Sequence, residues 1–110
     1  MVQQTFVTDH SPMEAKLEIQ FLEDATETMR AMAHPIRIAI IDLLHQNEKM
    51  SVTEIYEALK IEQAVASHHL RILKNKQVVT VQREQKFSLY SLQDSGYFQM
   101  IDILTALLKK

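Results

Sequence analysis

The hydrophobic pattern of this chain changes from a helical repeat to an alternating one immediately after Lys76. Before that point, apolar residues recur at the spacing of one helix face. After it, residues 78–81 and 87–92 are rich in alternating β-branched and aromatic side chains, and the polar stretch 82–86 separates them. Two such runs predict a β-hairpin with a charged tip. The chain is therefore expected to be mainly helical with one hairpin.

Two helices are predicted in the first half of the chain. Apolar residues follow a helical repeat over residues 13–33, and Ser11 followed by Pro12 is a typical helix start. Pro35 disfavours helical geometry at the residue before it and can itself open the next helix. That second helix, residues 35–46, is apolar nearly all round, which indicates a buried position at the centre of the domain.

A short helix and a longer one follow, joined by a tight turn. Ser51 and Glu54 have the spacing of a capping box, so a helix of about two turns begins there. After a turn at Ile61, a further helix is predicted from Gln63 to Lys74. Its apolar face consists of Ala66, Leu70 and Leu73.

A last helix is predicted after the hairpin, with Asp94 or Ser95 as its cap. The expected fold is thus mostly α (α+β): a winged helix-turn-helix of about five helices, with a two-stranded wing between the last two. Residues 1–12 have no clear period, so we expect a flexible N-terminal arm ahead of one domain over residues 13–110.

Composition excludes several classes of function. The absence of cysteine removes disulfides, thiolate nucleophiles and thiolate metal ligands. A single glycine leaves no Gly-rich phosphate loop. No catalytic arrangement of side chains stands out, so we expect neither an enzyme nor a cofactor. The chain has no signal-peptide pattern and no apolar run long enough to span a bilayer, so we expect a cytoplasmic protein without a membrane partner.

The net charge of −2 conceals an uneven distribution. Residues 1–60 carry a net charge of −5, whereas residues 61–110 carry +3. Between His68 and Lys86 only Glu84 is acidic, and the basic residues there are Arg71, Lys74, Lys76, Arg83 and Lys86. Such a segment can bind a polyanion through its local potential, although composition alone favours a solvated face.

The outer face of the helix 63–74 carries groups that suit DNA. Opposite its apolar face lie Gln63, Ala64, Ser67, His68, Arg71 and Lys74. Gln63 can pair bidentately with adenine, whereas Arg71 and Lys74 are better placed for phosphates. The hairpin tip adds Arg83, Gln85 and Lys86, which suit the flanking backbone or the minor groove. Taken alone, this pattern of residues also fits an ordinary amphipathic helix with a solvent-exposed polar face. The basic hairpin beside it favours a DNA-binding function.

Three segments of the chain resemble the ArsR (ArsR/SmtB) family of bacterial winged-helix repressors. They are His-Pro-Ile-Arg-Ile-Ala-Ile-Ile-Asp-Leu-Leu (34–44), Ala-Ser-His-His-Leu-Arg-Ile-Leu-Lys (66–74) and Tyr-Ser-Leu (90–92). The resemblance implies a homodimer, paired through its first and last helices, that binds an imperfect palindrome of double-stranded DNA and is nucleoid-associated when bound. It also places five residues at base-reading positions: Gln63, Ala64, Val65, Ser67 and His68.

The chain departs from the family pattern at three loops. Lys60, Gln77 and Gln85 stand where the family commonly has glycine. A side chain at such positions costs strain wherever the backbone needs a positive φ. We therefore expect altered loop geometry on an unchanged fold.

The family's metal-ligand sets are missing from this sequence. By the resemblance, one set would fall on Ser51 and Thr53, which supply no thiolate, and the other on Asp94, Gly96, Leu107 and Lys110. Of these only Asp94 is a ligand type, and an aspartate before a helix is more often a cap. Adjacent histidines such as His68 and His69 diverge on a helix and cannot chelate one ion together. We expect no metal site.

Dimerisation also has support from the residues themselves. The two terminal helices offer more apolar surface than a small three-helix core can cover. The expected interface consists of Leu17, Phe21, Met29, Tyr97, Phe98, Met100, Ile101 and Leu104. In the alternative arrangement, both helices cap their own domain.

Two other functions remain open at this stage. A winged helix can serve as a protein-interaction module without DNA binding, which would favour an acidic or apolar outer face on the helix 63–74. A repressor that senses an unidentified small molecule is also compatible with the sequence, since no residue pattern names the inducing signal or the operator.

Overall fold

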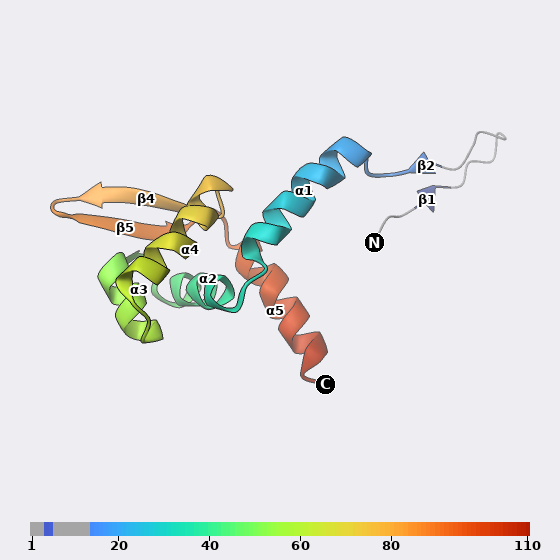
Figure 1. Cartoon of the computed structure of the whole chain (residues 1–110). Coiled ribbons are helices and arrows are strands. Elements are labelled where there is room, and N and C mark those ends of the chain that lie inside the picture. Colours follow the sequence, from blue (N-terminus) through green and yellow to red (C-terminus); the bar gives the residue numbers. More distant parts are fainter. Residues whose placement is uncertain (1–3, 6–13) are drawn as a thin grey trace.

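The computed structural model describes residues 4–5 and 14–110 and has the winged helix-turn-helix architecture (Figure 1). The described elements are β1 (Gln4–Thr5), β2 (Glu14–Ala15), α1 (Ile19–Met32), α2 (Pro35–Asn47), β3 (Met50–Ser51), α3 (Val52–Leu59), α4 (Gln63–Asn75), β4 (Val79–Glu84), β5 (Phe87–Leu92) and α5 (Gly96–Leu108). None of the helices described here is long and apolar enough to cross a membrane.

Helix α2 forms the centre of the domain, as its all-round apolar sequence predicts. Ile40, Ile41 and Leu44 are fully or almost fully buried, and the helix contacts all four of the other helices as well as β5. The start of α2 is fixed by His34, whose backbone is extended because Pro35 follows it. The Nδ1 atom of His34 accepts a hydrogen bond from the Ile36 amide at 3.1 Å and so caps the helix.

Helices α3 and α4 form the helix-turn-helix unit. At the start of α3 the predicted capping box is confirmed: the Glu54 amide donates to Ser51 Oγ, and the Ser51 amide donates to Glu54 Oε1. Helix α4 begins at Gln63 as predicted and runs one residue beyond Lys74. Its inner residues lock it against the core: Ala66, Leu70 and Leu73 are at most 1% exposed.

The predicted two-stranded wing is confirmed as the hairpin β4–β5, and the short strand β3 extends it to a three-stranded sheet in the order β3-β5-β4. The short strand β3 pairs antiparallel with β5, with Met50 opposite Tyr90 and Ser51 opposite Leu89. Strand β3 has two residues, which are too few to show an alternating hydrophobic pattern, so the sequence did not predict it. Strands β4 and β5 pair up to Glu84 and Phe87, and the turn is shorter than the predicted tip 82–86.

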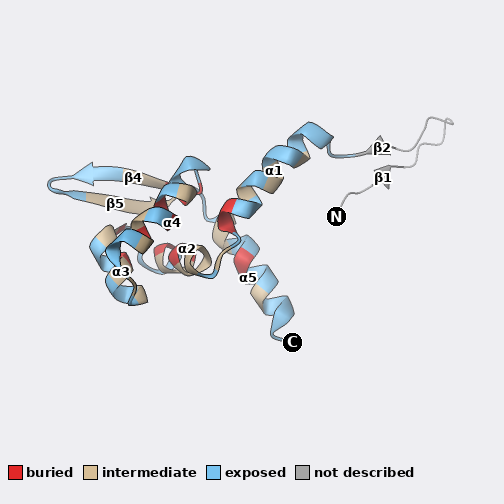
Figure 2. Ribbon diagram, in the orientation of Figure 1, coloured by how far each residue is buried: buried red, intermediate tan, exposed pale blue. Residues whose placement is uncertain are grey.

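Helices α1 and α5 project from the body on the side opposite the wing (Figure 1). Each is buried only where it meets the body, through Ala31 and Met32 in α1 and Ile101 in α5, and both are otherwise largely exposed (Figure 2). The predicted cap for α5 is confirmed: Asp94 Oδ1 accepts a hydrogen bond from the Gly96 amide at 2.7 Å.

The predicted start of the first helix is wrong. Helix α1 begins at Ile19, and residues 14–15 form strand β2, paired with β1. The apolar repeat continues upstream of the helix, but a repeat does not mark where hydrogen bonding begins. Ser11, Pro12 and the expected flexible arm lie, apart from strand β1, outside the described residues.

Candidate nucleic-acid interface

Helix α4 presents a polar and cationic face to solvent. Gln63, Ala64, His68, Arg71 and Lys74 are exposed. Val65 and Ser67 are partly buried, so of the five predicted base-reading residues these two are the least accessible. Because the opposite face is locked in the core, the direction of the exposed side chains is fixed by packing.

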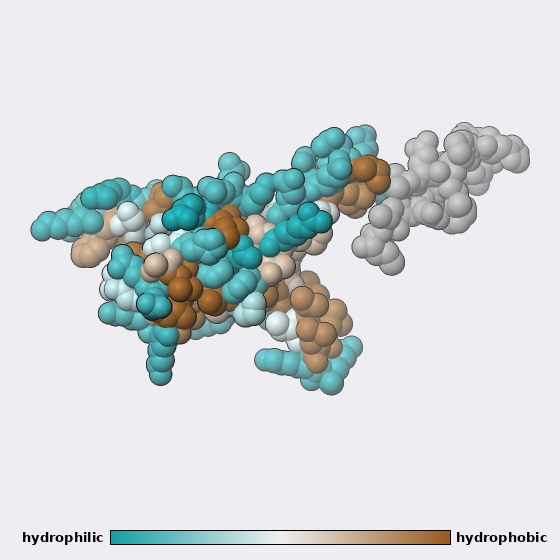
Figure 3. Space-filling view, viewed as in Figure 1, coloured by the Kyte–Doolittle hydropathy of each residue, from teal (hydrophilic) through white to brown (hydrophobic). Residues whose placement is uncertain are grey.

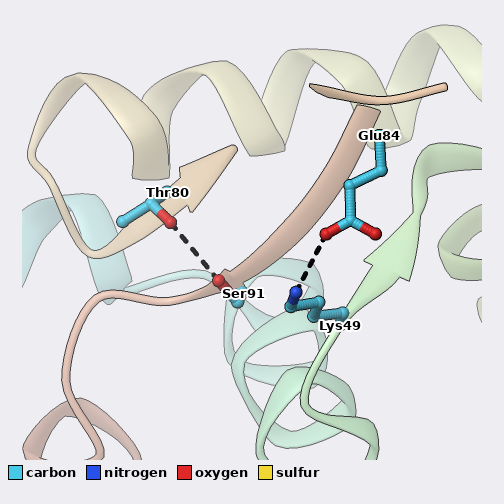
Figure 4. A network of polar contacts seen from close by, with 4 residues as sticks. All are labelled: Lys49, Thr80, Glu84 and Ser91. Carbon is cyan, nitrogen blue, oxygen red and sulfur yellow. Dashed lines mark hydrogen bonds and ion pairs between the residues drawn. The ribbon is translucent and has the colours of Figure 1, made fainter. Parts of the chain in front are cut away.

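The wing adds a second cationic element beside α4. Arg83, Gln85 and Lys86 are exposed at the end of the hairpin. The only acidic residue of the segment, Glu84, forms an ion pair with Lys49 of the α2–β3 turn at 3.0 Å (Figure 4). This contact joins residues 35 positions apart and was not predictable from local sequence. The ion pair compensates the negative charge of Glu84, and the positive charges of the wing therefore remain available to an anionic partner.

A cross-strand contact stiffens the base of the same hairpin. Thr80 and Ser91 face each other in the β4–β5 register, and their hydroxyl oxygens are 3.3 Å apart (Figure 4). Hydroxyl pairs of this kind stabilise antiparallel strands. The tip turns at Gln85 and Lys86, and Gln85 has a φ of 56°.

One histidine of α4 faces the core, which the sequence did not predict. His69 is 7% exposed, and its ring centroid lies 4.3 Å from that of His34 and 5.1 Å from that of His68. Within residues 14–110, His69 Nδ1 and Arg37 Nε are buried without a hydrogen-bond partner. Burial lowers the pKa of His69, and the nearby His34, Arg37 and His68 lower it further.

The apolar surface of the molecule is concentrated on the two projecting helices. Figure 3 shows apolar surface along α5 and at the N-terminal end of α1. The exposed apolar residues of these helices are Ile19, Phe21, Met29, Met100, Ile103, Leu104, Leu107 and Leu108. Four of the eight predicted interface residues, Phe21, Met29, Met100 and Leu104, belong to this group.

The other four predicted interface residues have different surroundings. Leu17 is exposed but precedes α1. Ile101 is only 9% exposed and packs in the core of this chain, so it is the least accessible of the predicted interface residues. Tyr97 and Phe98 are partly buried against the same core, and the Phe98 ring stacks on His45 at a centroid distance of 3.7 Å.

Comparison with known proteins identifies the relatives of this chain. Residues 32–82 match a family described as a helix-turn-helix domain. The HTH-type transcriptional regulator NmtR of Mycobacterium tuberculosis is 35% identical over 88 residues, covering 80% of this chain and 72% of NmtR. The chain belongs to the ArsR/SmtB family of winged helix-turn-helix transcriptional regulators.

Solved structures support the membership in the ArsR/SmtB family. The transcriptional repressor PagR of Bacillus anthracis is 36% identical over 72 residues, covering 66% of this chain and 68% of PagR. The PagR crystal structure superposes with a TM-score of 0.71 at 32% identity, over 79% of this chain and 99% of PagR. A homodimeric winged helix-turn-helix domain of Mycobacterium bovis, Mb0332, has a TM-score of 0.75 at 21% identity, over 90% of this chain and 91% of Mb0332, which supports the fold.

This ArsR/SmtB chain keeps the turns in which glycine is expected from the resemblance. Lys60, Gln77 and Gln85 have φ values of 56°, 59° and 56°. At all three positions the backbone has a positive φ and carries a side chain, which is the arrangement that the sequence associates with strain. Such a conformation costs roughly 1–2 kcal/mol per residue with a Cβ.

The positions of the ArsR/SmtB metal ligands have structural roles in this chain. Ser51 caps α3, and Asp94 accepts the Gly96 amide at the start of α5. Across the part of the chain that the structure describes, no group of three or more His, Cys, Asp or Glu residues could hold a metal ion.

Proposed function

We propose that this protein is a homodimeric repressor that binds an imperfect DNA palindrome through α4 and the wing. The observation that carries the proposal is the division of α4 into a buried apolar face and an exposed cationic one, with the basic wing beside it. In a winged helix-turn-helix, the second helix of the unit enters the major groove. We expect no enzymatic activity.

The proposed contacts divide between bases and phosphates. Gln63, Ala64, Val65, Ser67 and His68 lie on the N-terminal half of α4, the part of a recognition helix that reaches base edges. Arg71 and Lys74 follow on the same helix and contact phosphates, whereas Arg83, Gln85 and Lys86 reach the flanking backbone or minor groove.

The proposed dimer pairs α1 and α5 of two protomers. The exposed fractions of Phe21 and Leu104 are 59% and 51%, although both are large apolar residues. Exposed apolar surface of this extent marks an interaction site. The homodimeric state of Mb0332, which shares the fold, supports a two-fold pairing as well. Such pairing sets two recognition helices about one DNA turn apart.

The test is a fluorescence-anisotropy titration of the full chain with duplexes from the DNA flanking its own gene. We expect tight, salt-sensitive binding to one palindromic fragment, and binding to random duplex that is weaker by about 10³-fold or more. No preference over random duplex at low salt would exclude the sequence-specific repressor and would favour the alternative of a winged-helix protein-interaction module.

We also propose that no metal ion controls the DNA affinity. Ser51 and Asp94, at the family's ligand positions, are engaged in helix caps. The same anisotropy titration, repeated with zinc and then with nickel ions, should give an unchanged affinity. A loss of DNA affinity at stoichiometric metal would show that ligands from two protomers assemble a site.

A further inference from the structure

A hollow of about 380 Å³ lies where the end of α1, the start of α2 and the end of α4 meet. Arg30, Arg37 and Lys76 line it together with one acidic residue, Glu27, and its apolar wall includes Ala31 and Ile72. The volume is within the range of pockets that bind small molecules. The three elements bring together residues that are up to 49 positions apart in the chain.

The charges around this hollow are unbalanced. Lys76 Nζ forms an ion pair with Glu27 Oε1 at 2.6 Å, which also lowers the pKa of Glu27. Neither Arg30 nor Arg37 forms an ion pair among the described residues. Arg37 Nε, moreover, is a buried donor without an acceptor in that part of the chain. The charge of Arg37 therefore has no ionic partner among the described residues, and an anion in the hollow would supply one.

We propose that this hollow binds a small organic anion, a carboxylate or phosphate ester with a short apolar body. Two guanidinium groups match the planar oxygens of such a ligand and can bind it through paired hydrogen bonds. Ala31 and Ile72 would contact its apolar part. A DNA phosphate shares the anionic chemistry but brings no such apolar body. The hollow also lies at the C-terminal end of α4, about 18 Å along the helix from Gln63.

From the location of the hollow we infer that the ligand regulates DNA binding, an inference that rests on the proposed function. One wall of the hollow belongs to α1, part of the proposed dimer interface, and another to α4, which reads DNA. An anion that contacts both favours one relative placement of the two helices. If that placement differs between the free and the DNA-bound dimer, the anion binds one of these two states more tightly than the other. The ratio of its two dissociation constants then sets how much the affinity for DNA changes.

Binding can be tested without DNA by titrating the ¹⁵N-labelled full chain with benzoate and with phenyl phosphate, and recording amide chemical shifts. We expect shifts at Ala31, Arg37 and Ile72 at millimolar ligand. Benzamide, which has the shape of benzoate but no charge, should cause none. The Arg30→Gln variant should weaken benzoate binding about tenfold, because a charged hydrogen-bonding partner is lost. Lys110→Gln, which removes a terminal charge, is the matched control and should bind like the parent.

Three outcomes would overturn the proposal. The first is the absence of shifts at the hollow with both anions, and the second is an equal response to benzamide. The third is that Arg30→Gln leaves benzoate binding unchanged while lowering the affinity for DNA, which would make the hollow a contact for the DNA backbone. Because the shifts are recorded on the free protein, a chain that binds benzoate but no DNA would retain the site and refute only the repressor function.

Discussion

His69 has an unusual position for a polar side chain on a DNA-reading helix. Its neighbour His68 is exposed, but His69 packs under α4 against His34 with Nδ1 buried. Burial lowers its pKa from the ordinary value of 6.5, and the nearby His34, Arg37 and His68 lower it further. The folded protein therefore holds His69 in its neutral form over a pH range in which the unfolded chain takes up a proton.

This difference predicts a loss of stability in mild acid. As the pH falls below 6.5, the unfolded state binds more protons than the folded state, so the free energy of unfolding decreases until the folded-state pKa is passed. We expect His69→Phe, which cannot titrate, to flatten this dependence between about pH 7 and pH 5. Urea unfolding at a series of pH values measures it. An unchanged slope in His69→Phe would contradict the assignment.

Gln77 ends α4 in a conformation that suits glycine. Its φ is 59°, its amide donates to the Lys74 carbonyl at 2.9 Å, and the Val78 amide donates to the Leu73 carbonyl at 2.9 Å. These two bonds form a Schellman motif, in which the left-handed residue is usually glycine. Lys60 ends α3 in the same way: its amide donates to the Glu57 carbonyl, and the Ile61 amide donates to the Tyr56 carbonyl.

We therefore expect Gln77→Gly to stabilise the protein. The glycine relieves the left-handed strain, and its greater freedom in the unfolded chain offsets part of the gain, so the net effect is about 0.5–1 kcal/mol. Thermal unfolding measured by circular dichroism should show a midpoint raised by a few degrees. Gln77→Ala keeps a Cβ and should give no increase. A destabilised Gln77→Gly protein would show that the side chain itself holds the turn.

The sequence predicted the burial of those residues whose environment depends only on the local hydrophobic repeat. Ala66 and Leu70 were placed correctly on the inner face because helix geometry alone decides it. The burial of His69 depends on the space beside α2, and the pairing of Lys49 with Glu84 depends on how the hairpin folds back over the α2–β3 turn. Neither of these long-range contacts leaves a periodic signal in the sequence.

At the scale of the element, the proposed recognition helix α4 has two tasks along its length. Its N-terminal half carries polar groups of moderate length, whereas Arg71 and Lys74 follow as exposed cations. A base contact affects discrimination between sequences, and a phosphate contact affects all sequences alike. The two halves therefore make separable contributions to DNA binding.

Two substitutions on α4 should separate these contributions. Arg71→Ala should weaken binding to cognate and random DNA alike and reduce the slope of log affinity against log salt by about one. Gln63→Ala should cost about 1–3 kcal/mol on the cognate site and little on random DNA. Anisotropy titrations at several salt concentrations measure both. Equal losses on both DNAs from the Gln63→Ala variant would remove Gln63 from the base-reading set.

Element boundaries were predicted with uneven success for physical reasons. Helix α2 begins at Pro35, α3 begins after the cap Ser51, and α4 begins after a short turn. Each of these starts has a local cause, and the sequence predicted all three. Helix α1 lacks such a determinant: Glu18 precedes it without a side-chain cap, and the apolar repeat extends further upstream. Strand β3 exists only through its pairing with β5, so it could not be found before the sheet was known.

At the scale of the whole molecule, the exposed apolar faces of α1 and α5 form the proposed dimer interface. Leu104→Glu places a charge on the proposed interface, where burying it unpaired is costly. We expect this variant to be monomeric by sedimentation equilibrium and to lose at least about tenfold in affinity for the palindrome. Its affinity for a single half-site should remain. Gln99→Glu, an exposed substitution on the same helix, should stay dimeric, and a dimeric Leu104→Glu protein would place the interface elsewhere.

Strand β3 has a consequence for the DNA as well as for the protein. It leads directly into α3 and is hydrogen-bonded to β5, so the helix-turn-helix and the wing are parts of one sheet-linked body. In the proposed complex, the protein therefore sets the distance between the major-groove contact and the wing contact within each half-site. Adding one base pair between them would move one contact by about 3.4 Å along the duplex. A half-site for this protein should therefore have a fixed internal length, and any tolerance of spacing in the operator should lie between the two half-sites.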